Sequence, residues 1–345
     1  MFSENDPKSW KDKLRFSRRR VMQDIWPQLR DWFVGRERFA LATVVRASKP
    51  SPRGVGSVLA IHEDGVRFVG SVSAGCVEHE VIETSKMCLA DGKTRWMSFG
   101  PGEGFPWEIE LSCGGSIEVR IEPAPHLRSG TDDSFVEELI EIMDSHRSMI
   151  WRSSEESDTL LEVSKDDDAT REEREGETRV LFRLLGRRKR LFVIGASHIA
   201  LNLAATAKLL QYEVIVIDPR ESYAREDRFQ FRPDALHVEW PQGALGNYFL
   251  GDDDALVAIT HDPKIDDQAL AAALRTDCGY VGALGSRRSH AARLSRLGKQ
   301  GFGQEDLERI YGPVGLDIGS RTPAEIAVSI VAQLIRIRRK GIAAS

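Results

Sequence analysis

The chain has 345 residues, of which 41% are hydrophobic and 29% are charged, and its formal net charge is −5. This length indicates two domains with ample core, and the small negative charge argues against a general nucleic-acid-binding protein, which would carry a basic excess. No apolar run reaches the ~20 residues that a membrane helix needs, and polar residues interrupt the segment that would follow the basic N-terminus of a secretory signal. We therefore expect a cytoplasmic protein that binds neither nucleic acid nor membrane.

The first 35 residues are predicted to form a helical segment, with a helix from Ser17 to Val34 that Pro27 would kink or split. A small α+β domain is predicted over residues 36–125. Its expected strands cover residues 39–45, 57–61, 66–69, 94–99 and 116–121, and its expected helix covers residues 77–89.

Residues 126–188 are predicted to contain a helix over residues 133–145 and then an acidic connection. Ser, Asp, Glu and Arg dominate residues 153–177, and such a composition buries little surface. We expect this stretch to be a mobile linker or an exposed hairpin.

From residue 189 to residue 345 the pattern alternates between strands and helices. The expected strands are residues 191–194, 213–217, 255–259 and 280–283, and the expected helices are residues 199–210, 267–274, 286–297 and 323–339. This alternation predicts a doubly wound parallel sheet. The predicted fold class is therefore α/β, with the α+β domain followed by a Rossmann-like domain.

The turn Gly195-Ala196-Ser197-His198-Ile199-Ala200 joins a predicted strand to a predicted helix and approximates the dinucleotide fingerprint G-x-G-x-x-G/A. Ser197 stands where a second glycine normally lets the backbone approach a pyrophosphate. Asp218 ends the next strand, where an acid can bind a ribose hydroxyl. Three interpretations of this turn remain open. It binds a phosphate at the helix N-terminus, it is only a signature of the fold, or it forms a complete NAD site.

Two cysteines lie beside glycines, in Gly75-Cys76 and Cys113-Gly114. Glycine lets the backbone crowd a ligand, and a thiolate at a helix start is a soft ligand for metal or sulfur chemistry. Small buried thiols are the alternative for both. Neither belongs to a C-x-x-C pair, so no structural zinc site is expected.

Further loops are predicted to gather at the carboxyl edge of the parallel sheet, where ligands bind in open α/β folds. Arg287 and Arg321 could pair with phosphate, with Gly285 and Asp317 in the same loops. His261 precedes an Asp-Pro turn. It acts either as a catalytic acid or base, or it belongs to an ordinary strand end with no chemical role.

Taken in order, these motifs resemble the XdhC/CoxI family of xanthine dehydrogenase accessory factors. The matching segments are residues 42–46, 51–53, 70–78, 113–115, 195–200, 217–220, 260–263, 282–287 and 315–323. Two positions depart from the family pattern: Ser197 replaces a usual glycine, and Ala74-Gly75 replaces a frequent pair of glycines.

The resemblance implies a CoxI-like domain before a Rossmann-like domain, often in a homodimer. Family members bind molybdenum cofactor, help to install its terminal sulfur and pass it to the apo-enzyme. The resemblance also implies that Cys76 and Cys113 hold or serve the cofactor. The full set of expected cofactor-binding residues is Cys76, Cys113, Gly75, Gly114, Gly195, Ser197, His198, Asp218, His261, Gly285, Arg287, Asp317 and Arg321.

The implied partners are a molybdenum hydroxylase client such as xanthine dehydrogenase and a cysteine desulfurase. The sequence does not distinguish molybdopterin from its cytidine dinucleotide form. The rival interpretation is an NAD(P)-dependent oxidoreductase that uses Gly195, Asp218 and an acid/base His261. A scaffold whose sites have decayed is a third.

Overall fold

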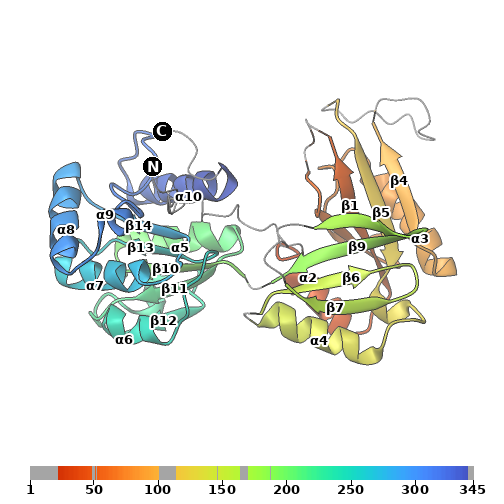
Figure 1. The fold of residues 1–345 in the computed structure, drawn as a ribbon, viewed down its shortest axis with the longest axis horizontal. Coiled ribbons are helices and arrows are strands. Elements are labelled where there is room, and N and C mark those ends of the chain that lie inside the picture. Colours follow the sequence, from red (N-terminus) through yellow and green to blue (C-terminus); the bar gives the residue numbers. More distant parts are fainter. Residues whose placement is uncertain are drawn as a thin grey trace, which may run out of the picture. The chain divides into compact units, whose positions relative to one another are not determined.

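The computed structural model describes residues 22–340, apart from residues 49–50, 52, 101–113, 146, 164–169 and 187. The chain divides into two compact units, an N-terminal unit that ends at residue 187 and a C-terminal unit that starts at residue 188 (Figure 1). No helix in the described part of the chain combines the length and the apolar character that crossing a bilayer requires.

The N-terminal unit contains a five-stranded antiparallel sheet. Its spatial order is β3 (Phe68–Gly70), β2 (Val58–His62), β1 (Phe39–Ala47), β5 (Ile117–Pro123) and β4 (Arg95–Phe99). Along β1, Phe39 and Leu41 face one hydrophobic core, whereas Ala40 and Ala42 face another. α3 (Glu78–Asp91) covers the second face, so this central strand is buried on both sides.

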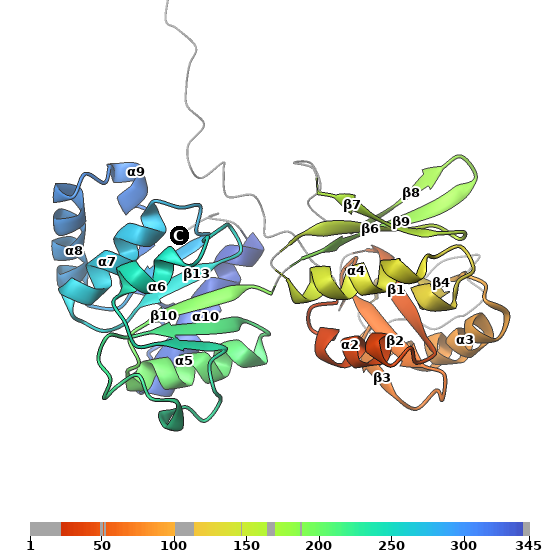
Figure 2. The same ribbon diagram turned by 90° about the horizontal axis from the view of Figure 1, so that it is seen from below.

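A second, four-stranded antiparallel sheet completes this unit. Its spatial order is β7 (Asp158–Glu162), β6 (Met149–Ser153), β9 (Thr178–Leu185) and β8 (Arg171–Glu175). α2 (Trp26–Val34) and α4 (Asp133–Asp144) share one core with both sheets, which Figure 2 shows as separate layers.

Residues 153–177 are therefore not a mobile linker, and that interpretation is wrong where the chain is described. The hairpin alternative is closer, because β6–β7 and β8–β9 are antiparallel hairpins. The polar composition belongs to β7 and β8, the edge strands, which expose most of their side chains. Edge strands carry such polar surfaces without losing their pairing to a buried neighbour.

The N-terminal helix is also shorter than predicted. α2 begins at Trp26 with Pro27 in its first turn, and residues 22–25 form bends and turns. Proline lacks an N–H and obstructs the preceding turn, so it is tolerated at a helix start and not in an interior. The proposed cap Ser17 lies outside the described residues.

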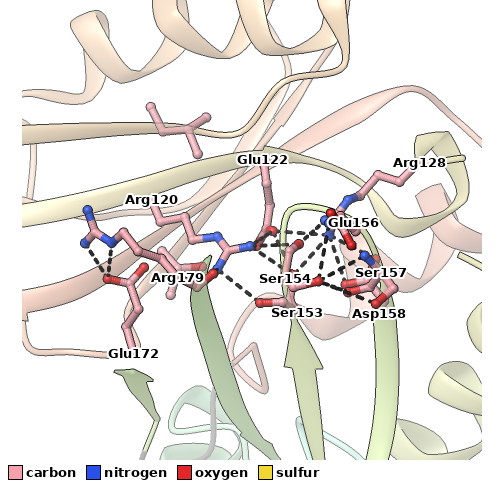
Figure 3. Close-up of polar contacts among 12 residues, drawn as sticks. Arg120, Glu122, Arg128, Ser153, Ser154, Glu156, Ser157, Asp158, Glu172 and Arg179 are labelled. Atoms are coloured by element: carbon pink, nitrogen blue, oxygen red, sulfur yellow. Dashed lines mark hydrogen bonds and ion pairs between the residues drawn. The ribbon is translucent and has the colours of Figure 1, made fainter. Parts of the chain in front are cut away.

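A buried ionic network joins the two sheets of this unit. Figure 3 shows Arg120 and Glu122 of β5 beside Ser153 and Asp158 of the second sheet, with Arg128 reaching the same group. Glu122 accepts hydrogen bonds from Arg120 Nη2 and Ser153 Oγ, both at 2.8 Å. Arg120 Nη1 donates to the Ser153 carbonyl at 3.1 Å. The network therefore binds the two layers together through charge-assisted hydrogen bonds.

The C-terminal unit is built on a six-stranded sheet whose five pairings are all parallel. Its spatial order is β12 (Ala235–His237), β11 (Glu213–Ile217), β10 (Arg190–Ile194), β13 (Ala255–Ala258), β14 (Tyr280–Ala283) and β15 (Ile310–Tyr311). By sequence this is the order 3-2-1-4-5-6 of a Rossmann fold. The predicted α/β class, with a parallel Rossmann-like sheet, is confirmed.

Helices cover both faces of this sheet (Figure 2). α5 (His198–Leu209) and α10 (Pro323–Lys340) pack on one face, and α6 (Pro241–Gly246) and α7 (Pro263–Leu274) pack on the other, which α8 (Arg287–Lys299) also borders. The predicted strands and longer helices are all present. The short elements β12, α6, α9 (Gln304–Leu307) and β15 were not predicted, because they are too brief to show a period.

Candidate functional site at the carboxyl edge of the parallel sheet

The strand order reverses between β10 and β13, which is where open α/β folds bind ligands. Gly195 follows β10 with φ of +103°, and its N–H donates to the Ile217 carbonyl at 2.8 Å. A Cβ on Gly195 would lie 2.6 Å from Thr260 Cγ2 in the loop after β13. Glycine is therefore required here both by the backbone angle and by the closeness of the two loops.

Asp218 directly follows β11 and holds the Gly195 turn in place. The Ala196 N–H donates to its Oδ2 at 2.8 Å, and Arg220 donates from Nε to Oδ1 at 2.8 Å and from Nη2 to Oδ2 at 2.7 Å. Burial by itself would raise the pKa of Asp218, but these hydrogen bonds outweigh it and lower the pKa below its usual value. The carboxylate is fully buried, and both of its oxygens are engaged within the protein.

Ser197 and His198 begin α5. Ser197 occupies the N-cap position without capping the helix, and its Oγ is buried with no hydrogen-bond partner among the described residues. His198 is exposed. The first amides of α5 lack partners within the helix, as at any helix start, so this end can attract an anion.

The loops after β13 and β14 surround a pocket between α7 and α8, with a volume of about 130 Å³. His261 is exposed at its rim in a left-handed conformation, with φ of +64°. Asp266 and Arg293 line the pocket and are 1% and 4% exposed. Burial raises the pKa of Asp266, against hydrogen bonds from Thr260, and lowers the pKa of Arg293.

Asp266 and Arg293 were not identified from the sequence, although a signal was present. Asp266 lies three and four residues before the buried Ala269 and Leu270, so helical spacing places it on the buried face of α7. Arg293 lies four residues before the buried Leu297 of α8 in the same way. A charge on the buried face of a helix needs a partner or a ligand.

The structure does not bring every expected residue into this group. Gly195, Ala196 and Asp218 are joined by the contacts above, and Gly195 approaches Thr260 beside His261. Gly285 has φ of +143° and adjoins Ser289 of α8. Arg287, Asp317 and Arg321 are exposed, and in the described structure no side-chain hydrogen bond ties them to the turn. Their role in binding remains a prediction.

In the N-terminal unit, Cys76 lies in a tightly bonded loop that leads into α3. Its N–H donates to Ser73 Oγ at 2.9 Å, and the residue is partly buried against a core cluster. The two preceding residues, Ala74 and Gly75, have φ of +68° and +113°. Glycine suits both angles better than alanine does, which gives a physical reason for two glycines at these positions.

Cys113 lies outside the described residues. The expectation that Cys76 and Cys113 converge on one ligand therefore stays a prediction. Gly114 is exposed, with open space where a Cβ would lie. Among the residues that the structure describes, no three His, Cys, Asp or Glu side chains are grouped as a metal site would require.

Glu78 organises the Cys76 loop. Its carboxylate accepts hydrogen bonds from Ser71 Oγ at 2.7 Å, from Ser73 N and Gly75 N at 2.9 Å, and from Ser73 Oγ. Burial opposes its ionisation, but these donors outweigh burial and lower the pKa of Glu78 to about 2.

We expect Glu78→Gln to destabilise the N-terminal unit by about 1–2 kcal/mol at neutral pH, because the lost hydrogen bonds are charge-assisted but only half-buried. The lowered pKa stabilises the fold fully above about pH 4.5, and this contribution disappears as the pH falls toward 2. Urea unfolding between pH 7 and pH 2 should show a smaller pH dependence in the variant. An identical pH dependence in both proteins would mean that Glu78 does not hold the loop.

Comparisons with known proteins agree with this architecture. The model of the XdhC and CoxI family matches residues 32–100, and the model of the XdhC Rossmann domain matches residues 191–334. A crystal structure described as a xanthine dehydrogenase from Bacillus halodurans has a TM-score of 0.71 at 24% identity, over 93% of this chain and 98% of that one. That likeness concerns the fold.

Three relatives from bacteria have related sequences. A probable xanthine dehydrogenase subunit of Bacillus subtilis is 27% identical, over 88% of this chain and 94% of its own. The molybdenum cofactor insertion chaperone PaoD of Escherichia coli is 26% identical, over 86% of this chain and 83% of its own. YqeB of Escherichia coli is 24% identical over 87% of this chain, which spans only 43% of YqeB. With both family models matched in order along its two units, the chain belongs to the XdhC and CoxI family.

Proposed function

We propose that this protein binds molybdenum cofactor as cargo, assists its sulfuration with a cysteine desulfurase, and inserts it into a molybdenum hydroxylase such as a xanthine dehydrogenase. The names of PaoD and of the Bacillus subtilis relative support this role. Cys76, in a loop of unusual backbone conformation, offers a soft sulfur ligand suited to such a cargo. The start of α5 and the strand-end loops offer sites for a phosphate group.

One observation carries the choice against an NAD-dependent oxidoreductase. An enzyme that holds NAD at this turn uses the acid after the second strand to bind a ribose hydroxyl. Here that acid is Asp218, which is fully buried and accepts hydrogen bonds from Ala196 N–H and Arg220 on both oxygens. A ribose would have to displace Arg220, so binding of NAD in the usual pose is disfavoured.

The test is to incubate the purified chain with released molybdenum cofactor, and separately with NADH, and to measure what is retained after gel filtration by fluorescence. We expect retention of the cofactor and not of NADH, with elution as a homodimer. The double variant Cys76→Ala/Cys113→Ala should lose at least tenfold in retained cofactor while its circular dichroism stays unchanged.

Cys278→Ala is the matched control. This thiol is buried against backbone carbonyls, and burial raises its pKa to about 12, so it is not available as a ligand. The control should keep the cofactor. Tight retention of NADH, together with unchanged cofactor binding in the double variant, would favour the oxidoreductase instead.

A further inference from the structure

The pocket between α7 and α8 contains a buried aspartate, Asp266, and a buried arginine, Arg293, that do not form a hydrogen bond with each other. Asp266 Oδ1 accepts hydrogen bonds from Thr260 Oγ1 at 2.6 Å and Thr260 N at 3.2 Å, but Oδ2 has no hydrogen-bond partner in the described structure. Arg293 Nη2 donates to the Leu284 carbonyl at 2.9 Å, whereas its Nε and Nη1 have no acceptor there. The shortest contact between the two, from Nη2 to Oδ2, is 3.8 Å.

The neighbouring Arg296 and Asp267 on the same two helices do pair with each other. Arg296 donates from Nε and Nη2 to the two oxygens of Asp267, at 2.5 and 3.0 Å. A bidentate ion pair can therefore form across α7 and α8. Leaving buried donors and an acceptor unpaired beside it is costly, and such groups in a pocket are often completed by a ligand.

The polarity of the unpaired atoms limits what the ligand can be. Arg293 offers hydrogen-bond donors, while Asp266 offers an acceptor, and both residues line one small pocket. A phosphate or carboxylate would satisfy Arg293 but would meet the Asp266 carboxylate with like charge. A group that accepts at one atom and donates at the next satisfies both residues.

We propose that this pocket binds the polar edge of a planar nitrogen heterocycle that carries an acceptor beside an N–H donor. The lactam of a pterin and the amino edge of a cytosine both present this pattern, and the choice of these rings rests on the proposed function. Asp266 accepts the N–H, and Arg293 donates to the adjacent carbonyl oxygen of the pterin or ring nitrogen of the cytosine. The unpaired atoms are covered in this structure, so ring binding requires side chains that line the pocket to move.

The experiment titrates the full chain with pterin, with cytidine and with inorganic phosphate, by calorimetry and ligand-observed NMR. We expect one of the two rings to bind the wild type in a 1:1 ratio and phosphate not to bind. The ring that binds shows whether the pocket recognises a pterin or a cytosine. Asp266→Asn keeps the acceptor toward Thr260 and puts an NH₂ donor in the pocket. It should weaken ring binding at least tenfold and allow phosphate to bind.

Asp267→Asn is the matched control, because it makes the same change one residue away in the pair with Arg296, and it should leave ring binding unchanged. Arg293→Met should also lose ring binding, with a thermal melt to verify folding. Failure of both rings to bind the wild type, equal binding to Asp266→Asn, or preferential binding of phosphate to the wild type would overturn the proposal. Retention of molybdenum cofactor by the wild type is measured in parallel. If the wild type fails to retain the cofactor, the proposed function is wrong, whereas the proposal for the pocket depends only on the titrations with the rings.

Discussion

Glu122→Gln is expected to lower the free energy of unfolding of the N-terminal unit by about 3–5 kcal/mol, the usual cost of leaving buried charges uncompensated. The Glu122 side chain is 1% exposed. Its Oε2 accepts from Arg120, Arg128 and Ser153, and its Oε1 accepts from Arg183 of β9 (Figure 3 shows the first three partners). One carboxylate therefore serves three arginines that lie between two sheets.

The balance of charge makes this position sensitive. The cluster holds Arg120, Arg128 and Arg183 against Glu122 and Asp158, so neutralising Glu122 leaves three buried cations with a single carboxylate. Burial alone would raise the pKa of Glu122, but the three arginines lower it well below its usual range. The arginines therefore favour the ionised form of Glu122.

Urea unfolding followed by tryptophan fluorescence is a suitable measurement, because five of the seven tryptophans lie within residues 18–187 of the N-terminal unit. Glu63→Gln is the control, since it removes an exposed carboxylate that pairs with Arg38 and should cost no more than about 1 kcal/mol. Equal losses from Glu122→Gln and Glu63→Gln would show that the buried network does not hold the two sheets together.

This network also shows where sequence patterns stop being informative. The parallel sheet was predictable because each strand is a short apolar run followed by a helix. Arg120 and Arg183 are charged residues within strands, and nothing local distinguishes them from exposed ones. They become buried partners only because β5 and the β6–β9 sheet, far apart in sequence, pack against each other. The segment with the edge strands β7 and β8 was interpreted as a linker because its polar composition does not show the strands with which it pairs.

At the candidate site, the sequence predicted the turn between strand and helix but not the contacts between side chains. The Gly195 turn was predicted from a glycine between a strand and a helix, and the structure has it between β10 and α5. Ligand binding at this turn remains a prediction, based on where open α/β folds bind their ligands. The pairing of Asp218 with Arg220 was not predicted, because it depends on side-chain orientation two residues apart. The unmatched pair Asp266 and Arg293 was missed because it joins two helices that the sequence treats separately.

Gly195→Ala is expected to destabilise the C-terminal unit by about 3 kcal/mol, from roughly 1–3 kcal/mol of backbone strain and a similar cost of overpacking. The strain arises because alanine rarely adopts φ of +103°, and the overpacking arises because its Cβ would lie 2.6 Å from Thr260 Cγ2. The two causes can be separated. Thr260→Ser removes Cγ2 and keeps the hydroxyl that donates to Asp266, so the double variant should recover part of the loss. The Thr260 backbone N, at 3.3 Å, still limits that recovery.

Urea unfolding followed by far-UV circular dichroism measures this cost, with Gly246→Ala as the control. Gly246 ends α6 with open space around it and no positive φ, so alanine there should be neutral or gain up to about 1 kcal/mol. Because the turn lies where the strand order reverses, the variant should also retain less molybdenum cofactor at a temperature where it is fully folded. A Gly195→Ala protein as stable as Gly246→Ala would mean that the turn relaxes freely. Unchanged cofactor retention in a destabilised variant would mean that the turn supports the fold without touching the ligand.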